Sequence, residues 1–327
     1  MALETIDCPV CGSPDARLWL TARDINLFRR GEFRLVRCPE CHLVYMNPRP
    51  SRDDMSVYYP DHYWAPPPPD DVPPYLDAGM RRTLDLLVRD YPGGRVLDVG
   101  CAVGKLPALM RERGLDAVGL EPYEHAAGIA RERYGLEVVC GFLQEADLPE
   151  ASFDAITFFD VLEHLHDPVG DLRKARSLLK PGGAVFVKVP NIAALQARLF
   201  GKWWYWLDTP RHLTHFSPRS LRRALAEAGF RDISCRPIPE TEGAMVFQTS
   251  LFYWLRGLHL ARKGIQVEPR PGRPAGEVLQ GHVYAGVPSA GKRAFRWFAK
   301  YVLYLPFAFE NLIGRSVELL AVARKPS

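Results

Sequence analysis

The stretch Val96-Leu-Asp-Val-Gly-Cys-Ala-Val-Gly104 decides the fold of this chain. A short apolar run, residues 95–99, is followed by a glycine-rich turn and then by a helical pattern. In a doubly wound sheet, such a turn lets a ligand approach main-chain N–H groups at a helix N-terminus. A glycine-rich turn alone is weak evidence, so its surroundings must decide what it binds.

Outward from this turn, short apolar runs alternate with helical patterns. The runs lie at 95–99, 116–120, 136–140, 153–159, 184–189 and 231–237, and the helical patterns lie at 105–113, 123–133, 168–179 and from Ser217 to Gly229. Strands that are apolar throughout and alternate with helices belong to a parallel sheet that is covered on both faces. The sequence therefore predicts a doubly wound α/β fold.

Two acidic residues indicate the ligand of this sheet. Asp98 ends the first strand, and Glu121 ends the second. A carboxylate at the second position can accept hydrogen bonds from both hydroxyls of a ribose. An acid inside the first loop would repel a pyrophosphate, but it suits a cationic or zwitterionic ligand. The pair therefore argues against NAD and for S-adenosylmethionine.

With these motifs the chain resembles the class I S-adenosylmethionine-dependent methyltransferases, especially the ubiquinone-type and sugar-associated bacterial members. Further motifs carry the resemblance: Val118-Gly-Leu-Glu-Pro122, Leu148-Pro-Glu-Ala-Ser-Phe-Asp154, Phe159-Asp-Val-Leu-Glu-His-Leu-His-Asp-Pro168 and Leu178-Leu-Lys-Pro-Gly-Gly183. The family implies a seven-stranded sheet with six parallel strands and a last antiparallel strand, for which we expect residues 316–324. Residues 238–315 would then form a helical insertion before that strand.

The resemblance also implies which residues bind the cofactor. The turn would hold the methionine end, Glu121 the ribose, and Asp160 would lie beside the cofactor. Many members carry an acid after the third strand to bind the adenine amine, and residues 141–146 lack it at that place. The expected cofactor-binding residues are Asp98, Gly100, Ala102, Gly104, Glu121, Phe142, Leu143 and Asp160.

Methyl transfer to a hydroxyl needs an aligned nucleophile and a base that removes its proton. The candidate catalytic residues are His164, His215, His212 and Glu163. A structural loop histidine and a packed loop closing over the cofactor are the alternatives, and Glu163 could instead be a partner of His164 or a metal ligand. Arg211 could pair with an anionic acceptor, and the aromatic run 203–206 could stack on a sugar or ring.

Four of the seven cysteines form two Cys-x-x-Cys pairs, and these are Cys8, Cys11, Cys38 and Cys41. Four thiolates suit a tetrahedral, structural Zn²⁺ with no open position for chemistry. We therefore expect a zinc ribbon with a hairpin at 17–37 between the pairs; a redox dithiol or unrelated surface cysteines are the alternatives. The ribbon, which ends in Asn47-Pro-Arg-Pro50, is similar to one fused to such methyltransferases in bacterial polysaccharide and secondary-metabolite contexts.

Proline and charge divide the chain further. Seven of the fifteen residues at 60–74 are proline, which favours an extended spacer. The predicted parts are a ribbon at 1–59, a linker at 60–77 and a methyltransferase domain at 78–327. Residues 255–300 hold nine Lys and Arg against two acids, beside aromatic helices. A helical cap, a dimer surface or peripheral membrane contact through 245–312 would fit this composition.

Composition limits the function. With 47% hydrophobic residues the chain is not disordered, and a formal charge of +4 names no polyanion partner. The start has no apolar signal segment, and no apolar stretch is long enough to span a bilayer, so we expect a cytoplasmic protein. We expect methyl transfer to oxygen, or to carbon, of a small molecule or glycan intermediate. The alternatives are an RNA methyltransferase, which a charge-neutral ribbon disfavours, and a non-catalytic cofactor sensor. The sequence predicts no oligomeric state.

Overall fold

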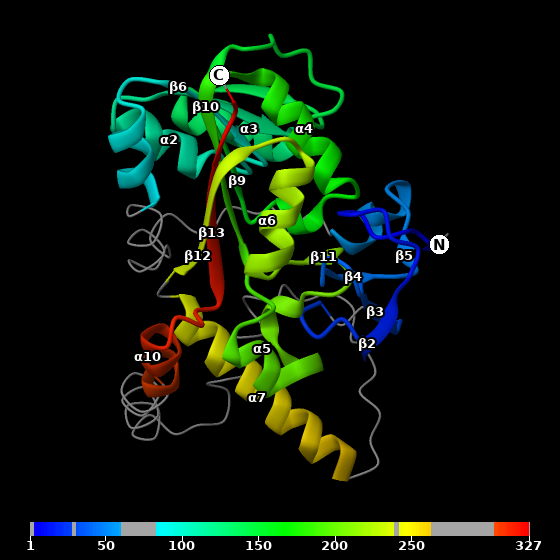
Figure 1. The fold of residues 1–327 in the computed structure, drawn as a ribbon. Helices are drawn as coiled ribbons and strands as arrows, with labels where there is room; N and C mark the ends of the chain where they lie inside the picture. Colours follow the sequence, from blue (N-terminus) through cyan, green and yellow to red (C-terminus); the bar gives the residue numbers. More distant parts are fainter. Residues whose placement is uncertain (1–2, 28–30, 60–82, 239–241, 263–303, 327) are drawn as a thin grey trace, which may run out of the picture.

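The structure is a computed structural model, and it describes residues 3–27, 31–59, 83–238, 242–262 and 304–326 of the 327-residue chain (Figure 1). The predicted linker at 60–77 lies outside the described residues. Of the cationic stretch 255–300, only residues 255–262 lie inside them. The predictions for the linker and for most of that stretch therefore stay predictions.

A seven-stranded sheet forms the centre of the molecule, in the order β12-β13-β10-β9-β6-β7-β8. Its strands are β6 (Arg95–Val99), β7 (Asp116–Glu121), β8 (Glu137–Cys140), β9 (Phe153–Phe159), β10 (Leu179–Pro190), β12 (Arg231–Ile238) and β13 (Glu318–Arg324). β13 runs antiparallel to both β10 and β12, whereas the pairs among β6 to β10 are parallel. The predicted doubly wound sheet with an antiparallel last strand is confirmed.

Helices cover both faces of this sheet. They are α2 (Lys105–Glu112), α3 (Glu124–Tyr134), α4 (Pro168–Leu178) and α6 (Pro218–Glu227). Adjacent residues of β6 point to opposite faces: Leu97 packs in one apolar cluster with α4 and α6, and Val96 packs in another with α2. The helix starts follow from the sequence, because Asp167 and Ser217 cap α4 and α6 before a first-turn proline.

The N-terminal ribbon contains the predicted hairpin. Its strands are β1 (Leu3–Glu4), β2 (Arg17–Ala22), β3 (Phe33–Arg37), β4 (Val44–Met46) and β5 (Arg49–Pro50), followed by the 3₁₀ helix η1 (Asp53–Tyr58). A strand from the other part of the chain, β11 (Thr214–His215), completes the ribbon sheet in the order β11-β4-β3-β2. Figure 1 shows these strands on the side of the molecule where β11 lies.

The insertion packs against a short helical segment after β10. This segment contains α5 (Leu195–Phe200), η4 (Gly201–Trp203) and η5 (Tyr205–Leu207), and the insertion contributes α7 (Glu242–Arg262) and α10 (Tyr304–Leu312). Trp204 is 0% exposed and lies in one apolar cluster with Phe247 of α7. This member of the aromatic run 203–206 is therefore a core residue.

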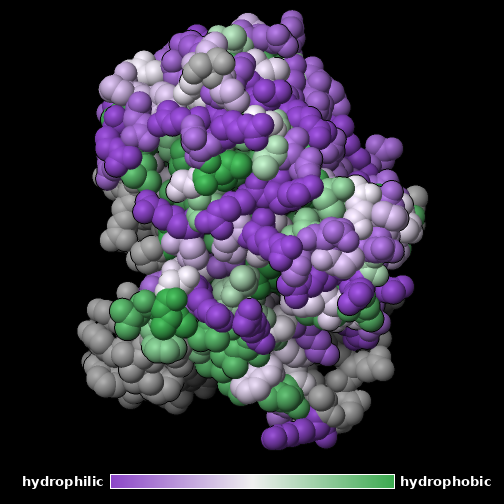
Figure 2. Space-filling view, viewed as in Figure 1, coloured by the Kyte–Doolittle hydropathy of each residue, from purple (hydrophilic) through white to green (hydrophobic). Residues whose placement is uncertain are grey.

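Part of the insertion surface is apolar. Figure 2 shows hydrophobic residues gathered at the end of the molecule where α7 and α10 lie in Figure 1. Leu255, Phe309 and Leu312 are among the large exposed side chains there. No helix in the described part of the chain is both long and apolar enough to cross a bilayer.

Candidate active site and metal centre

Two buried carboxyl groups lie at the carboxyl ends of adjacent parallel strands. Asp98 on β6 is 2% exposed, and Glu121 on β7 is 1% exposed. Burial raises the pKa of Asp98 to about 7, although the Thr157 hydroxyl donates an opposing hydrogen bond of 2.5 Å. Burial also raises the pKa of Glu121, which accepts hydrogen bonds from the N–H groups of Ala102 and Tyr123, both at 3.0 Å.

The glycine-rich turn has backbone conformations that side chains disfavour. Gly100 and Gly104 have φ values of 71° and 84°, and Ala102 between them has 48°. A Cβ on Gly100 would lie 2.5 Å from a methyl carbon of Val161, and one on Gly104 would lie 2.6 Å from Cβ of Ala130. The glycines are thus required both by the turn and by close packing against its neighbours.

Asp160 places a third carboxylate near the turn, since it directly precedes Val161. Its Oδ2 lies 2.9 Å from Nζ of Lys188, yet 47% of its side chain is exposed. Three carboxyl groups at the ends of β6, β7 and β9 suit a ligand that carries an ammonium group and ribose hydroxyls. These hydrogen-bond acceptors thus fit S-adenosylmethionine.

The two residues expected to contact adenine differ in exposure. Phe142 is 41% exposed, and the guanidinium carbon of Arg52 lies 3.9 Å from its ring centroid. Leu143 is 4% exposed and belongs to the core. Adenine contact by the Phe142 side chain and by the Leu143 backbone stays a prediction.

The four candidate catalytic residues lie together. The 3₁₀ helix η3 (Leu162–His164) carries Glu163 and His164, the loop that leads into β11 carries His212, and β11 itself carries His215. Ring centroids of His164 and His212 are 4.6 Å apart, and those of His212 and His215 are 6.2 Å apart. The Leu213 N–H donates to the Glu163 carbonyl at 2.9 Å, which ties the loop to η3.

Backbone carbonyl oxygens lie beside Nδ1 of two of these histidines. Nδ1 of His164 lies 3.1 Å from the Arg211 carbonyl oxygen, and Nδ1 of His212 lies 3.0 Å from that of Trp206. Because a carbonyl only accepts, we assign the proton to each Nδ1 and a lone pair to each Nε2; the Tyr59 hydroxyl, 2.9 Å from Nδ1 of His164, can accept from the same proton. Burial lowers the pKa of both rings, that of His212 well below its usual range, and lowers the pKa of His215 to about 3.

Glu163 is the least satisfied group of the cluster. It is 1% exposed, and among the described residues neither carboxyl oxygen has a hydrogen-bond partner. Burial raises its pKa well above the usual range, and its Oε1 lies 3.9 Å from Nε2 of His212. One ligand atom each from Glu163, His164 and His212 lie within 4.8 Å of one another, so this set could hold a divalent metal ion.

The contacts that Tyr59 and Arg211 make with His164 were not expected from the sequence. The Tyr59 hydroxyl lies 2.9 Å from Nδ1 of His164. Arg211 is 0% exposed, and its guanidinium bonds to Asp24 and Asp208. The expectation that Arg211 could pair with an anionic acceptor is therefore wrong, because its charge is already satisfied inside the protein. No motif marks Tyr59 or Asp24 in the sequence.

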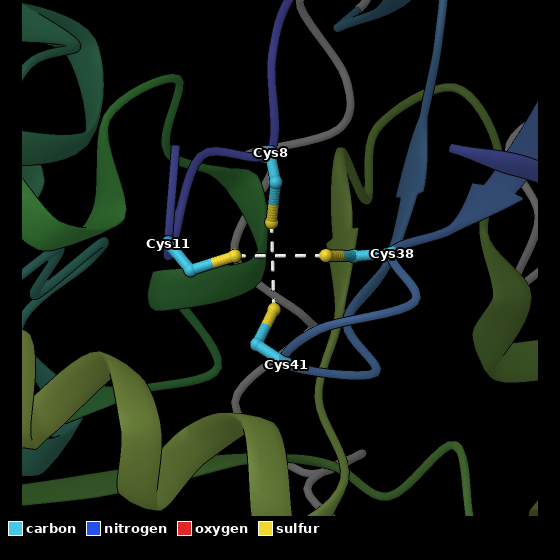
Figure 3. Close-up of side chains that lie close together, drawn as sticks. All are labelled: Cys8, Cys11, Cys38 and Cys41. Atoms are coloured by element: carbon cyan, nitrogen blue, oxygen red, sulfur yellow. Dashed lines mark hydrogen bonds between the residues drawn. The ribbon is translucent and has the colours of Figure 1, made fainter. Parts of the chain in front are cut away.

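The four paired cysteines converge on one point (Figure 3). The sulfur atoms of Cys8 and Cys41 are 3.4 Å apart, those of Cys11 and Cys38 are 3.5 Å apart, and none of the four forms a disulfide. Zn–S bonds of about 2.3 Å in a tetrahedral site separate the sulfurs by about 3.8 Å. The cluster therefore fits one zinc ion with small adjustments.

Comparisons with known proteins agree with this geometry. Residues 74–235 match the family described as "Methyltransferase domain". The ubiquinone biosynthesis O-methyltransferase of Idiomarina loihiensis is 28% identical over 187 residues, which cover 54% of this chain and 72% of the relative. The enzyme of the same name from Stutzerimonas stutzeri is 35% identical over 106 residues, covering 30% of this chain and 45% of that relative, less than half its length.

A solved structure supports the fold. Phosphoethanolamine N-methyltransferase 2 of Haemonchus contortus, in complex with S-adenosyl-L-methionine, aligns with a TM-score of 0.50 at 15% identity. The alignment covers 87% of this chain and 63% of that one. At such low identity the likeness concerns the fold alone.

Proposed function

The chain carries a class I S-adenosylmethionine-dependent methyltransferase domain, and from this premise we propose that it methylates an oxygen, or alternatively a carbon, of a small-molecule or glycan intermediate. The observation that carries the proposal is the cluster of His164, His212 and His215 around η3, the 3₁₀ helix that follows Asp160. An oxygen acceptor is further supported by the names of the bacterial relatives, which are O-methyltransferases.

The carboxyl groups at the strand ends bind the cofactor in this proposal. Asp98 and Asp160 face the methionine ammonium with the turn residues Gly100, Ala102 and Gly104, and Glu121 accepts hydrogen bonds from the ribose. Phe142 and the Leu143 backbone contact adenine. Bound S-adenosylmethionine supplies a methyl group on a positively charged sulfur.

His164 is the proposed general base. It is the least buried of the three clustered histidines, because His212 and His215 are only 7% and 3% exposed. Its free Nε2 can take the proton of an acceptor hydroxyl as the oxygen bonds to the methyl carbon and the sulfur keeps the electron pair of the broken bond. Glu163 and His212 then orient His164 or hold a metal ion beside the acceptor, and His215 supports the loop.

The cysteine cluster has a structural role in the proposal. Cys8, Cys11, Cys38 and Cys41 hold one zinc ion, which leaves no ligand position for chemistry. Zinc analysis of the purified protein tests this role, and less than one equivalent in undamaged material would contradict it.

Calorimetry and turnover test the function. The full-length chain is titrated with S-adenosylmethionine and then supplied with hydroxylated acceptors, both phenolic and sugar-derived, with product mass spectrometry as the readout. Absence of cofactor binding would refute the enzyme proposal. Binding without turnover of any acceptor would favour the cofactor-sensing alternative, and methylation of RNA would favour the nucleic-acid alternative.

A further inference from the structure

The ribbon holds the loop that carries the acceptor-side histidines. β11 pairs antiparallel with β4, so that Thr214 lies opposite Tyr45, and His215 opposite Val44. The Met46 N–H also donates to the Leu213 carbonyl at 2.9 Å. Because these are main-chain bonds, the position of the loop depends on the fold of the ribbon.

A buried arginine forms a second connection. Nη1 and Nη2 of Arg211 donate to the two carboxylate oxygens of Asp24 at 3.0 and 2.9 Å. Nε and Nη2 donate to Asp208 at 3.0 and 2.6 Å. Asp24 lies in the ribbon and is 3% exposed, and Asp208 lies in the loop. Paired donors on two carboxylates fix both the place and the plane of the guanidinium.

The main chain of the same arginine acts on His164. The Arg211 carbonyl oxygen lies 3.1 Å from Nδ1 of His164 and, because it can only accept, favours a proton on that nitrogen. Displacement of the main chain at Arg211 would remove this acceptor and leave the Tyr59 hydroxyl at Nδ1, and a hydroxyl can either donate or accept. The tautomer of His164 thus depends on where Arg211 is held.

We propose that Asp24 of the ribbon is a positioning residue for methyl transfer: by clamping Arg211, it places the carbonyl that keeps the His164 proton on Nδ1 and leaves Nε2 free for the acceptor. The ribbon is then part of the acceptor site. This inference rests on the proposed function of His164. It holds equally if Nε2 binds a metal ion, because a ligand nitrogen needs the same lone pair.

The substitution Asp24→Asn tests the clamp with little disturbance of the local turn. Oδ1 of Asp24 also accepts the N–H groups of Asn26 and Leu27, at 3.1 and 2.9 Å. An asparagine oxygen can keep those bonds and the one from Nη2, whereas its amide NH₂ would face Nη1 of Arg211 and break that bond. The matched control is Glu32→Gln, which removes the exposed 2.6 Å ion pair with Arg23 in the same ribbon.

The full-length protein is studied by three readouts: cofactor calorimetry, steady-state kinetics, and ¹⁵N NMR of the His164 ring, which reports the tautomer without turnover. For Asp24→Asn we expect cofactor affinity within about threefold of the parent and a mixture of His164 tautomers. We expect kcat to fall about 10- to 100-fold, less than the roughly 10²- to 10⁴-fold that a general base contributes, because the base itself is kept. The Glu32→Gln control should match the parent in all three.

Several results would overturn the proposal. The proposal is refuted if Asp24→Asn changes neither kcat nor the His164 tautomer. It is also refuted if kcat falls while the proton stays on Nδ1, because Asp24 would then affect turnover by a route other than the tautomer. If the parent chain turns over no acceptor, the proposed function fails, but the NMR signal still decides whether Asp24 positions His164. If Asp24→Asn does not fold, Arg211→Lys keeps the charge, loses the paired geometry and is judged by the same tautomer readout.

Discussion

The carboxyl ends of β6 and β7, where the cofactor is proposed to bind, and the histidine cluster are built in different ways. Glu121 takes its two hydrogen bonds from Ala102 and Tyr123, within one strand-helix-strand unit. His164 takes its contacts from Tyr59 and Arg211, which are 105 and 47 positions away. One end of the proposed site is therefore built locally by the sheet, and the other end also takes contacts from residues far away in the sequence, including Tyr59. Changes to the ribbon should therefore reduce turnover while leaving the affinity for the cofactor unchanged.

The largest difference between lost turnover and retained cofactor affinity is expected from Cys38→Ser. The variant loses one of the four proposed zinc ligands, and because the folding of a zinc ribbon depends on its metal, we expect β4 to lose its support. We expect turnover to fall by at least as much as removal of the base, about 10²- to 10⁴-fold, with cofactor affinity within about threefold. Zinc content, kinetics and calorimetry measure this. The exposed Cys140, changed to Ser, is the control, and joint loss of cofactor binding would contradict the separation.

His164→Gln should affect only the acceptor half. Loss of a general base costs about 10²- to 10⁴-fold in rate. His164 is not among the residues proposed to bind the cofactor. We expect kcat to fall by that amount while the cofactor affinity stays within about threefold. The exposed His259 of α7, changed to Gln, should leave both quantities unchanged. A kcat within threefold of the parent would remove His164 from the proposal.

Asp98→Asn should affect mainly the cofactor half. Hydrogen bonds to charged groups contribute about 1.5–3 kcal/mol, so the affinity for S-adenosylmethionine should fall about 10- to 100-fold. Calorimetry measures the loss, and zinc content should not change. An equal affinity would mean that the cofactor does not meet this carboxyl group.

The same carboxyl group predicts a pH dependence. With the pKa of Asp98 raised to about 7 by burial, the group is largely protonated below pH 7, and binding a cationic ligand requires the ionised form. Affinity should rise with pH up to about 7 and level off above it, with a slope approaching about tenfold per pH unit on the acidic side. Calorimetry between pH 5.5 and 8.5 measures the profile, and Asp98→Asn should flatten it.

The smallest effect is expected at the surface. Arg52 and Glu145 form a 2.9 Å ion pair between the ribbon side and the sheet domain, but their side chains are 46% and 62% exposed. Such pairs contribute about 0–1 kcal/mol. Glu145→Gln should leave kcat and cofactor affinity unchanged and shift thermal unfolding little. A large loss of turnover would show that surface contacts, rather than the buried clamp, join the two parts.

The sequence was sufficient for the sheet and for the cysteine cluster. Each strand of the sheet is marked by an apolar run, the starts of α4 and α6 by a capping residue before proline, and each thiol pair by a two-residue spacing, all of them local patterns. β13 extends over Glu318–Arg324, two residues shorter at its start than the predicted run. These features were predictable because their physical causes lie within a few neighbouring residues.

The acceptor side was predictable only in part. The histidines stand in recognisable motifs, but the residues that orient them do not. Asp24 meets Arg211 across 187 positions of sequence, and neither residue has a local pattern that indicates the contact. For the same reason Arg211 was misread as a group for an acceptor: a buried and an exposed arginine look alike in a sequence.

The pairing of β11 with β4 also determines where the protein can be divided. A chain cut within residues 60–77 would leave β4 as an open edge, with a row of unpaired N–H and C=O groups that readily accept a foreign strand. Produced as separate fragments, the two halves should therefore recombine with each other or aggregate. To move the ribbon intact onto another protein, the graft would have to carry β11 and its loop, which lie more than a hundred residues further along the chain.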